Sequence, residues 1–319
     1  MKTNLIILAM VVVVLVFASG CNTGGNSTTT ASPFLGGTNG LIIAFAPNAP
    51  PEQVYDSGQY PFDIDVKLKN AGETKVNKED VRVKISGIYY GDFNKSQADL
   101  IKSPDDDLEA TTKLSSGETR EGTESHVVFS DLLYTGNLSG DMPLTIRADV
   151  CYKYQTLANA KICVRQNMLD TTSEGVCTVS GDKVVYSSRA PVQVVSFSEQ
   201  SSGKNKLYFT FNVRHDGNGR IYAKGTMCNN TNFANKDKVW VTVSTGLSNL
   251  RCTGLSGGTD TSGYVKLYAG QTEGTGQTPV TCTQQVDTQT DYEKNVDITL
   301  DYDYEDDNSV DFVVKKSSQ

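Results

Sequence analysis

Seven cysteines are the side chains of this chain with the clearest chemistry. No two are spaced as C-x-x-C, the spacing typical of zinc ribbons and thioredoxin-like redox centres, so the cysteines predict neither. In an exported protein such cysteines form structural disulfides. Apart from Cys21, which directly follows an apolar leader, the disulfide candidates are Cys151, Cys163, Cys177, Cys228, Cys252 and Cys282.

The six disulfide candidates divide evenly, with three in each half of the chain. Three cysteines cannot all pair within one half, so we expect two local disulfides and one that links the halves. Each would constrain the unfolded chain and stabilise the fold by about 2–4 kcal/mol. The predicted pairs are Cys252–Cys282, Cys151–Cys163 and, across the halves, Cys177–Cys228.

Two acidic clusters, residues 105–107 and 301–307, could supply the hard oxygen ligands that Ca²⁺ requires. In an extended strand Asp301, Asp303 and Glu305 would share one face, with the intervening tyrosines on the other. Two interpretations stay open. The three carboxylates either form a solvated acidic face or bind Ca²⁺, which would then be the only cofactor.

A nucleophile or a histidine-based site has little support. Residues 254–258 match G-x-S-x-G, but the pattern that follows is strand-like, and no histidine comes after His215. The only other histidine, His126, lies in a strand-like run. We therefore interpret the motif as a glycine-rich turn, both histidines as structural or exposed, and the chain as lacking catalytic residues.

Surface modification and recognition are suggested by two further features. Tyr89 and Tyr90 could contribute to a glycan- or protein-binding surface, or could pack across strands. Where the host glycosylates exported proteins, Asn-x-Ser/Thr sequons could be modified. The sequons are at Asn26, Asn94, Asn137 and Asn229.

Apolar residues alternate with polar ones along much of the chain, as in residues 62–68, 207–213 and 296–300. A period of two predicts strands with one buried face, and short strands separated by turn residues are typical of β-sandwiches. Only residues 97–100 and 154–161 could hold a helical turn. The fold class predicted is all-β, with two immunoglobulin-like β-sandwich domains in tandem.

An internal repeat supports two sandwiches. Residues 66–72 and 211–217 both run from a strand into a glycine turn, and each is followed by a strand that ends in Tyr-x-Tyr, at residues 152–154 and 302–304. The predicted organisation is a signal peptide (1–20), a flexible Ser/Thr/Gly tether (21–40), a first sandwich (41–188) and a second sandwich (189–319).

The first residues predict export. Lys2 precedes an apolar run that ends at Ala18-Ser19-Gly20-Cys21, and the run is shorter than the roughly 20 residues of a membrane span. The end of the run resembles a prokaryotic lipobox, with Ala18 where leucine is usual. This resemblance implies a lipid on Cys21 that anchors the chain to the outer face of the cell membrane. An ordinary signal peptide or an uncleaved anchor is the alternative.

A strand that leads into an Asn-x-Gly turn, as at residues 66–72, resembles the CARDB-type immunoglobulin-like modules of archaeal cell-surface and S-layer-associated proteins. The resemblance implies adhesion, binding or spacing, with envelope proteins or glycans as partners. A formal charge of −8 and a pI near 4.9 oppose binding to nucleic acid. The alternatives are an exported hydrolase that uses carboxylates from separate loops and a pilin-like filament subunit.

Overall fold

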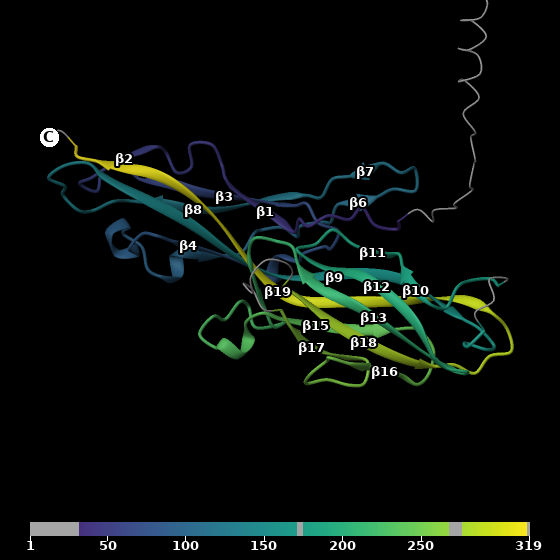
Figure 1. Ribbon diagram of the computed structural model, residues 1–319. Helices are drawn as coiled ribbons and strands as arrows, with labels where there is room; N and C mark the ends of the chain where they lie inside the picture. Colours follow the sequence, from purple (N-terminus) through teal and green to yellow (C-terminus); the bar gives the residue numbers. More distant parts are fainter. Residues whose placement is uncertain (1–31, 171–174, 268–275, 318–319) are drawn as a thin grey trace, which may run out of the picture. The chain divides into compact units, whose positions relative to one another are not determined.

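The computed structural model describes residues 32–170, 175–267 and 276–317, and these residues form strands joined by turns (Figure 1). The predicted all-β fold is confirmed. In the described ranges the only helical pieces are short 3₁₀ turns, and no helix is long and apolar enough to cross a membrane. The 3₁₀ turns are η1 (Lys78–Asp80), η2 (Tyr90–Phe93), η3 (Ala98–Leu100) and η4 (Phe233–Asn235).

The strands follow one another with short connections. Up to residue 164 they are β1 (Leu41–Phe45), β2 (Gln53–Tyr55), β3 (Phe62–Asn70), β4 (Val81–Ser86), β5 (Ile101–Lys102), β6 (Thr112–Lys113), β7 (Thr119–Arg120), β8 (Glu124–Leu132) and β9 (Met142–Val164). The later strands are β10 (Gly181–Lys183), β11 (Val185–Ser187), β12 (Val192–Gly203), β13 (Lys206–His215), β14 (Arg220–Tyr222), β15 (Lys238–Ser244), β16 (Leu250–Thr253), β17 (Ser262–Lys266), β18 (Gln277–Gln285) and β19 (Tyr292–Lys315).

One nine-stranded sheet organises the molecule, because β9 and β19 pair antiparallel along nearly their whole length, from Met142 opposite Val314 to Val164 opposite Tyr292. Neither strand has an internal glycine, and their one proline, Pro143, is the second residue of β9, so neither residue type interrupts the ladder away from its end. In Figure 1 these two strands, teal and yellow, run from one end of the described structure to the other.

Two smaller sheets cover different ends of this shared sheet. The sheet β1-β3-β8 packs on the C-terminal part of β19, where Phe62 of β3 lies 6.0 Å from Phe312 between ring centroids. The sheet β10-β12-β13-β18-β16 packs on the C-terminal part of β9, where the Thr156 hydroxyl donates to the Val192 carbonyl of β12. One half of the length of each long strand therefore belongs to the first sandwich, and the other half belongs to the second.

The two covering sheets repeat one topology, with β1-β3-β8 in the first half and β12-β13-β18 in the second. The predicted division at residue 188 falls between β11 and β12. However, β9, which precedes residue 188 in the sequence, and β19, which follows it, belong to one sheet. Residues from Pro33 onward form one compact unit. The alternative of a helical turn at residues 154–161 is wrong, because that segment pairs with β19 as a strand.

The disulfides differ from the predicted set in two pairs. Cys252–Cys282 is present, and the other bridges are Cys163–Cys177 and Cys151–Cys228. The predicted pairs Cys151–Cys163 and Cys177–Cys228 are wrong. Both Cys151 and Cys163 lie on β9, and twelve residues of strand separate two Cα atoms by roughly 40 Å, whereas a disulfide needs about 7 Å or less.

Candidate ligand site at the centre of the shared sheet

Four tyrosines mark the point where β9 and β19 pass from one sandwich to the other. Tyr152 and Tyr154 lie opposite Tyr304 and Tyr302, and all four side chains are buried on one face of the sheet. The ring centroids are 5.7 Å apart in the Tyr152–Tyr304 pair and 6.3 Å apart in the Tyr154–Tyr302 pair. The two Tyr-x-Tyr motifs thus form a single structural cluster.

The repeated glycines are explained by the same tyrosines. An added Cβ would lie 1.7 Å from the Tyr154 hydroxyl at Gly72 and 2.2 Å from the Tyr304 hydroxyl at Gly217. No side chain fits at either distance. The strand-to-glycine turn and the Tyr-x-Tyr strand of each half are therefore the two sides of one close contact, which accounts for their matched spacing in the sequence.

Asp301, Asp303 and Glu305 form the predicted acidic trio. They alternate with Tyr302 and Tyr304 along β19 and therefore point to the opposite face of the sheet. Asp303 is completely buried. Its carboxylate accepts hydrogen bonds from the backbone N–H groups of Gly225, Thr226 and Met227, at 2.9, 2.7 and 2.6 Å. Asp303 therefore fixes the loop that leads to Cys228 and its bridge to Cys151.

The other two acids of the trio also have protein partners. Asp301 accepts from the Gln155 side-chain amide at 2.8 Å, and Glu305 accepts from the Tyr222 hydroxyl at 2.9 Å and pairs with Arg220 at 3.0 Å. In the described part of the chain no three His, Cys, Asp or Glu side chains are grouped so that they could hold a metal ion. A solvated acidic face is wrong for Asp303, because its oxygens lie in the interior.

A polar pocket of about 430 Å³ opens on this face, beside Asp301. Both halves of the chain contribute to it. Its lining residues are Thr74, Lys75, Asn77, Asp80, Lys153, Tyr154, Gln155, Lys224 and Asp301. Its volume falls within the range of small-molecule sites, about 300–1,000 Å³.

Each lysine of the pocket has an acidic partner. Lys153 lies 2.8 Å from Asp80, Lys224 lies 3.5 Å from Asp301, and Lys75 contacts two carboxylates outside the pocket. The hydrogen bond to Asp80 raises the pKa of Lys153. Burial acts to raise the pKa of Asp80, but hydrogen bonds from Lys153 and Asn77 outweigh it and lower that pKa. The pocket lining therefore holds three lysines and two aspartates, and carboxylates beside the pocket offset the third lysine.

An aromatic pair borders the polar groups. Trp240 lies opposite Asp301 on one side and Tyr264 on the other, so the row Tyr264, Trp240, Asp301 and Gln155 crosses β17, β15, β19 and β9. The Trp240 and Tyr264 rings meet edge to face at 4.8 Å, and the Lys224 ammonium lies 4.4 Å from the Trp240 ring centroid. Both aromatic side chains are only partly buried.

The histidines and the G-x-S-x-G motif are not brought together. His126 is paired with Asp65 at 2.9 Å on the surface, whereas His215 contacts the Tyr304 hydroxyl at 3.0 Å. Ser256 lies in a turn, and its hydroxyl donates to the Tyr264 carbonyl at 3.1 Å. The motif is a turn beside β17, as the sequence suggested.

The remaining predicted residues are scattered. The sequons at Asn94, Asn137 and Asn229 are exposed, and Cys21 and Asn26 lie outside the described residues. Tyr89 and Tyr90 contact each other, with ring centroids 4.7 Å apart. In the acidic run 105–107, Asp107 pairs with Lys75 at 2.9 Å.

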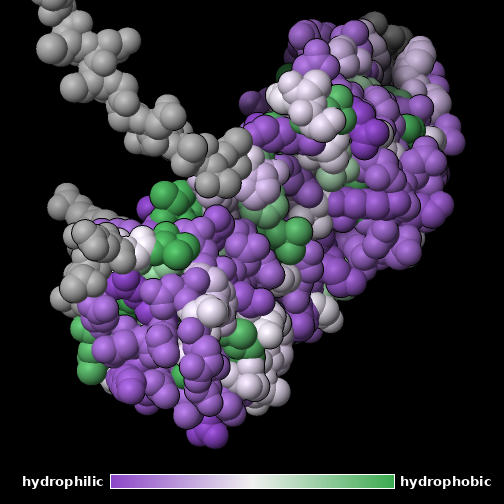
Figure 2. Space-filling view, turned by 90° about the vertical axis from the view of Figure 1, so that its right-hand side faces the viewer, coloured by the Kyte–Doolittle hydropathy of each residue, from purple (hydrophilic) through white to green (hydrophobic). Residues whose placement is uncertain are grey.

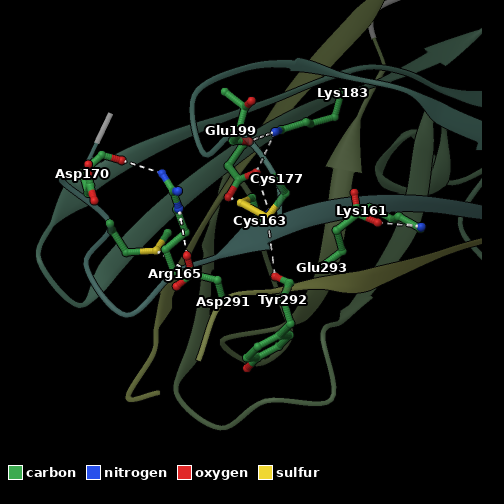
Figure 3. Close-up of a disulfide and its surroundings, with 12 residues drawn as sticks. Lys161, Cys163, Arg165, Asp170, Cys177, Lys183, Glu199, Asp291, Tyr292 and Glu293 are labelled. Carbon is green, nitrogen blue, oxygen red and sulfur yellow. Dashed lines mark hydrogen bonds and ion pairs between the residues drawn. A yellow bond between two sulfur atoms is a disulfide. The ribbon is translucent and has the colours of Figure 1, made fainter. Parts of the chain in front are cut away.

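A second buried acid, Glu199, lies beside the Cys163–Cys177 disulfide (Figure 3). Its carboxylate accepts from the Cys163 backbone N–H at 2.9 and 3.1 Å and lies 3.3 Å from the Lys183 ammonium. Burial raises the pKa of Glu199 to about 7, although the hydrogen bond and the lysine act in the opposite direction.

Sequence reasoning missed Lys153, Gln155, Lys224 and Trp240. A signal was present for the first two, because residues that flank Tyr154 in a strand must point away from it. Lys224 and Trp240 come from other elements and had no such signal. No protein-family model matches the chain, and no curated protein matches it.

Proposed function

We propose that this chain is an exported, lipid-anchored surface protein that binds or spaces components of the cell envelope and has no catalytic activity. One observation carries the proposal. Two β-sandwiches share the continuous pair β9–β19, and the Cys151–Cys228 bridge ties the loop of the second half to β9 near the centre of that pair, beside Tyr152. Such a unit resists bending, which suits a spacer or a display module.

Three disulfides support an oxidising, extracytoplasmic compartment. The face seen in Figure 2 is largely hydrophilic, and its apolar residues form small separate patches. The proposed anchor is a lipid on Cys21, followed by a tether that leads to Pro33, where the compact unit begins. The two halves would be modules similar to the CARDB type, each with the same strand order.

The test is expression of the full chain in a prokaryotic host that lipidates exported proteins. Intact mass should show the leader removed and Cys21 lipidated, and thiol labelling without reduction should find no free cysteine. The Cys21→Ser variant, as a control, should lose the lipid and keep the disulfides. A full-length product in the cytosol with reduced cysteines would contradict the proposal.

The alternative of an exported hydrolase needs two carboxylates that face a common space. Asp80 and Asp301 both line the pocket, but each is held by a lysine. No observation favours hydrolysis over binding, and the experiment in the next subsection separates the two.

A further inference from the structure

We propose that the pocket on the outer face of the shared sheet binds an uncharged oligosaccharide, with Trp240 as its stacking surface. The inference extends the proposed binding role by naming the class of ligand. It is drawn from the polar pocket, from the aromatic pair beside it and from the balance between lysines and carboxylates around the pocket.

The hydrogen-bonding groups of the pocket match vicinal hydroxyls. Lysine ammonium groups and side-chain amides donate, whereas the carboxylates and amide oxygens accept, and the lining contains both kinds. A sugar hydroxyl can donate and accept at once, so it can bridge an Asp–Lys pair such as Asp80–Lys153 without breaking it. Charge-assisted hydrogen bonds of this kind are the stronger ones.

The charge balance argues against an ionic ligand. A phosphate or carboxylate entering beside Lys153 and Lys224 would also meet Asp80 and Asp301, and a cation would meet the lysines. Either ion would gain from one neighbour and be repelled by the next. A neutral polyhydroxylated ligand has no such penalty.

The two aromatic residues extend the proposed site from the pocket across the neighbouring strands. Trp240 is next to Asp301 on the neighbouring strand, and Tyr264 follows it, so a chain of sugar units that enters the pocket could continue across both rings. The C–H face of a sugar packs on an aromatic ring, which combines a large apolar surface with a polar rim. The ligand would displace the Lys224 ammonium from the Trp240 ring.

Trp240 is the only tryptophan of the chain, and it therefore reports on this site alone. The experiment titrates the purified full chain, with its disulfides intact, with N-acetylchitohexaose, cellohexaose, maltohexaose and mannohexaose at up to millimolar concentration. We expect a saturable change in tryptophan emission with at least one of the four. Calorimetry under the same conditions should give the same affinity.

Matched variants locate the site. Lys153→Ala removes a pocket lysine and should weaken binding roughly tenfold, because a hydrogen bond from a charged group is lost. Lys161→Ala removes an equivalent surface lysine on the same face of β9, paired with Glu293, and should leave the affinity unchanged. Asp301→Asn, which keeps the shape of the side chain, should weaken binding as Lys153→Ala does.

The outcomes divide clearly. No saturable change with any of the four probes, or equal effects of Lys153→Ala and Lys161→Ala, overturns the oligosaccharide site and leaves export and anchoring untouched. Binding by a chain whose Cys21 stays unmodified in a host that lipidates exported proteins overturns the anchor and leaves the site intact. Release of shorter oligosaccharides during the titration would overturn the non-catalytic proposal in favour of a hydrolase.

Discussion

Glu199 provides the sharpest test of the electrostatics of this fold. Its side chain is completely buried, and burial raises its pKa from about 4.5 to about 7. The groups that face it are the Lys183 ammonium from β10 and the Cys163 N–H from β9. In the unfolded chain the carboxyl loses its proton near pH 4.5, whereas the folded protein keeps that proton up to about pH 7.

The sign of the effect follows from the proton count. Between the two pKa values the folded state binds one proton more than the unfolded state, so stability falls as the pH rises through this window. One pKa unit corresponds to about 1.4 kcal/mol, so the rise of the Glu199 pKa from about 4.5 to about 7 amounts to about 3 kcal/mol of stability lost between pH 4.5 and pH 7. Above pH 7 both states are ionised and the loss stays constant.

The perturbation is Glu199→Gln, which removes the titration and keeps an oxygen that can accept from Cys163. We expect the difference in unfolding free energy, variant minus wild type, to rise by about 3 kcal/mol from pH 4.5 to pH 7, whatever its starting value. Denaturant unfolding across this range, with disulfides intact, measures it. Glu293→Gln is the control, because it removes an exposed carboxylate that pairs with Lys161 nearby (Figure 3). Parallel curves for wild type and Glu199→Gln would refute the reasoning.

Three further predictions concern the centre of the shared sheet. Replacing Cys151 and Cys228 by Ala should lower the unfolding free energy by about 4 kcal/mol, and more than replacing Cys163 and Cys177, because the closed loops span 77 and 14 residues; equal losses in denaturant unfolding would contradict the loop argument. Gly217→Ala should destabilise by about 1–3 kcal/mol through its clash with Tyr304, whereas Gly140→Ala, with nothing within 4 Å, should not. The clash is checked with a double-mutant cycle, in which adding Tyr304→Phe should recover part of the loss. Asp303→Asn should cost about 1–3 kcal/mol and speed hydrogen exchange at the amides of Gly225, Thr226 and Met227, and unchanged exchange there would mean that the carboxylate does not hold the loop.

Local pattern was enough to predict the strands and not enough to predict where two of them end. The alternation at residues 62–68 and 296–300 appears in the structure as β3 and part of β19. The extent of β9 and β19 depends on their pairing with each other, and pairing between residues about 150 apart is not written in either segment alone. For the same reason the sequence placed Cys151 and Cys163 as partners, although a continuous strand holds them apart.

The acidic trio shows a second limit of local pattern. Alternation correctly separates Asp301, Asp303 and Glu305 from the tyrosines, but it describes the two faces and not what covers them. The loop at residues 225–227 comes from elsewhere in the chain and buries Asp303. A carboxylate that a period-two pattern assigns to solvent can therefore lie inside the protein when a distant loop supplies its hydrogen bonds.

The register between β9 and β19 determines both the packing of the tyrosine cluster and the arrangement of the proposed binding pocket. Because side chains alternate along a strand, a shift of β19 by one residue against β9 would exchange the faces and move the tyrosines to the pocket side. The close fit of Tyr304 and Tyr154 against Gly217 and Gly72 opposes such a shift. The same contacts then fix Asp301 beside Gln155 and Trp240, so the tyrosine cluster on the inner face determines the geometry of the pocket on the outer one.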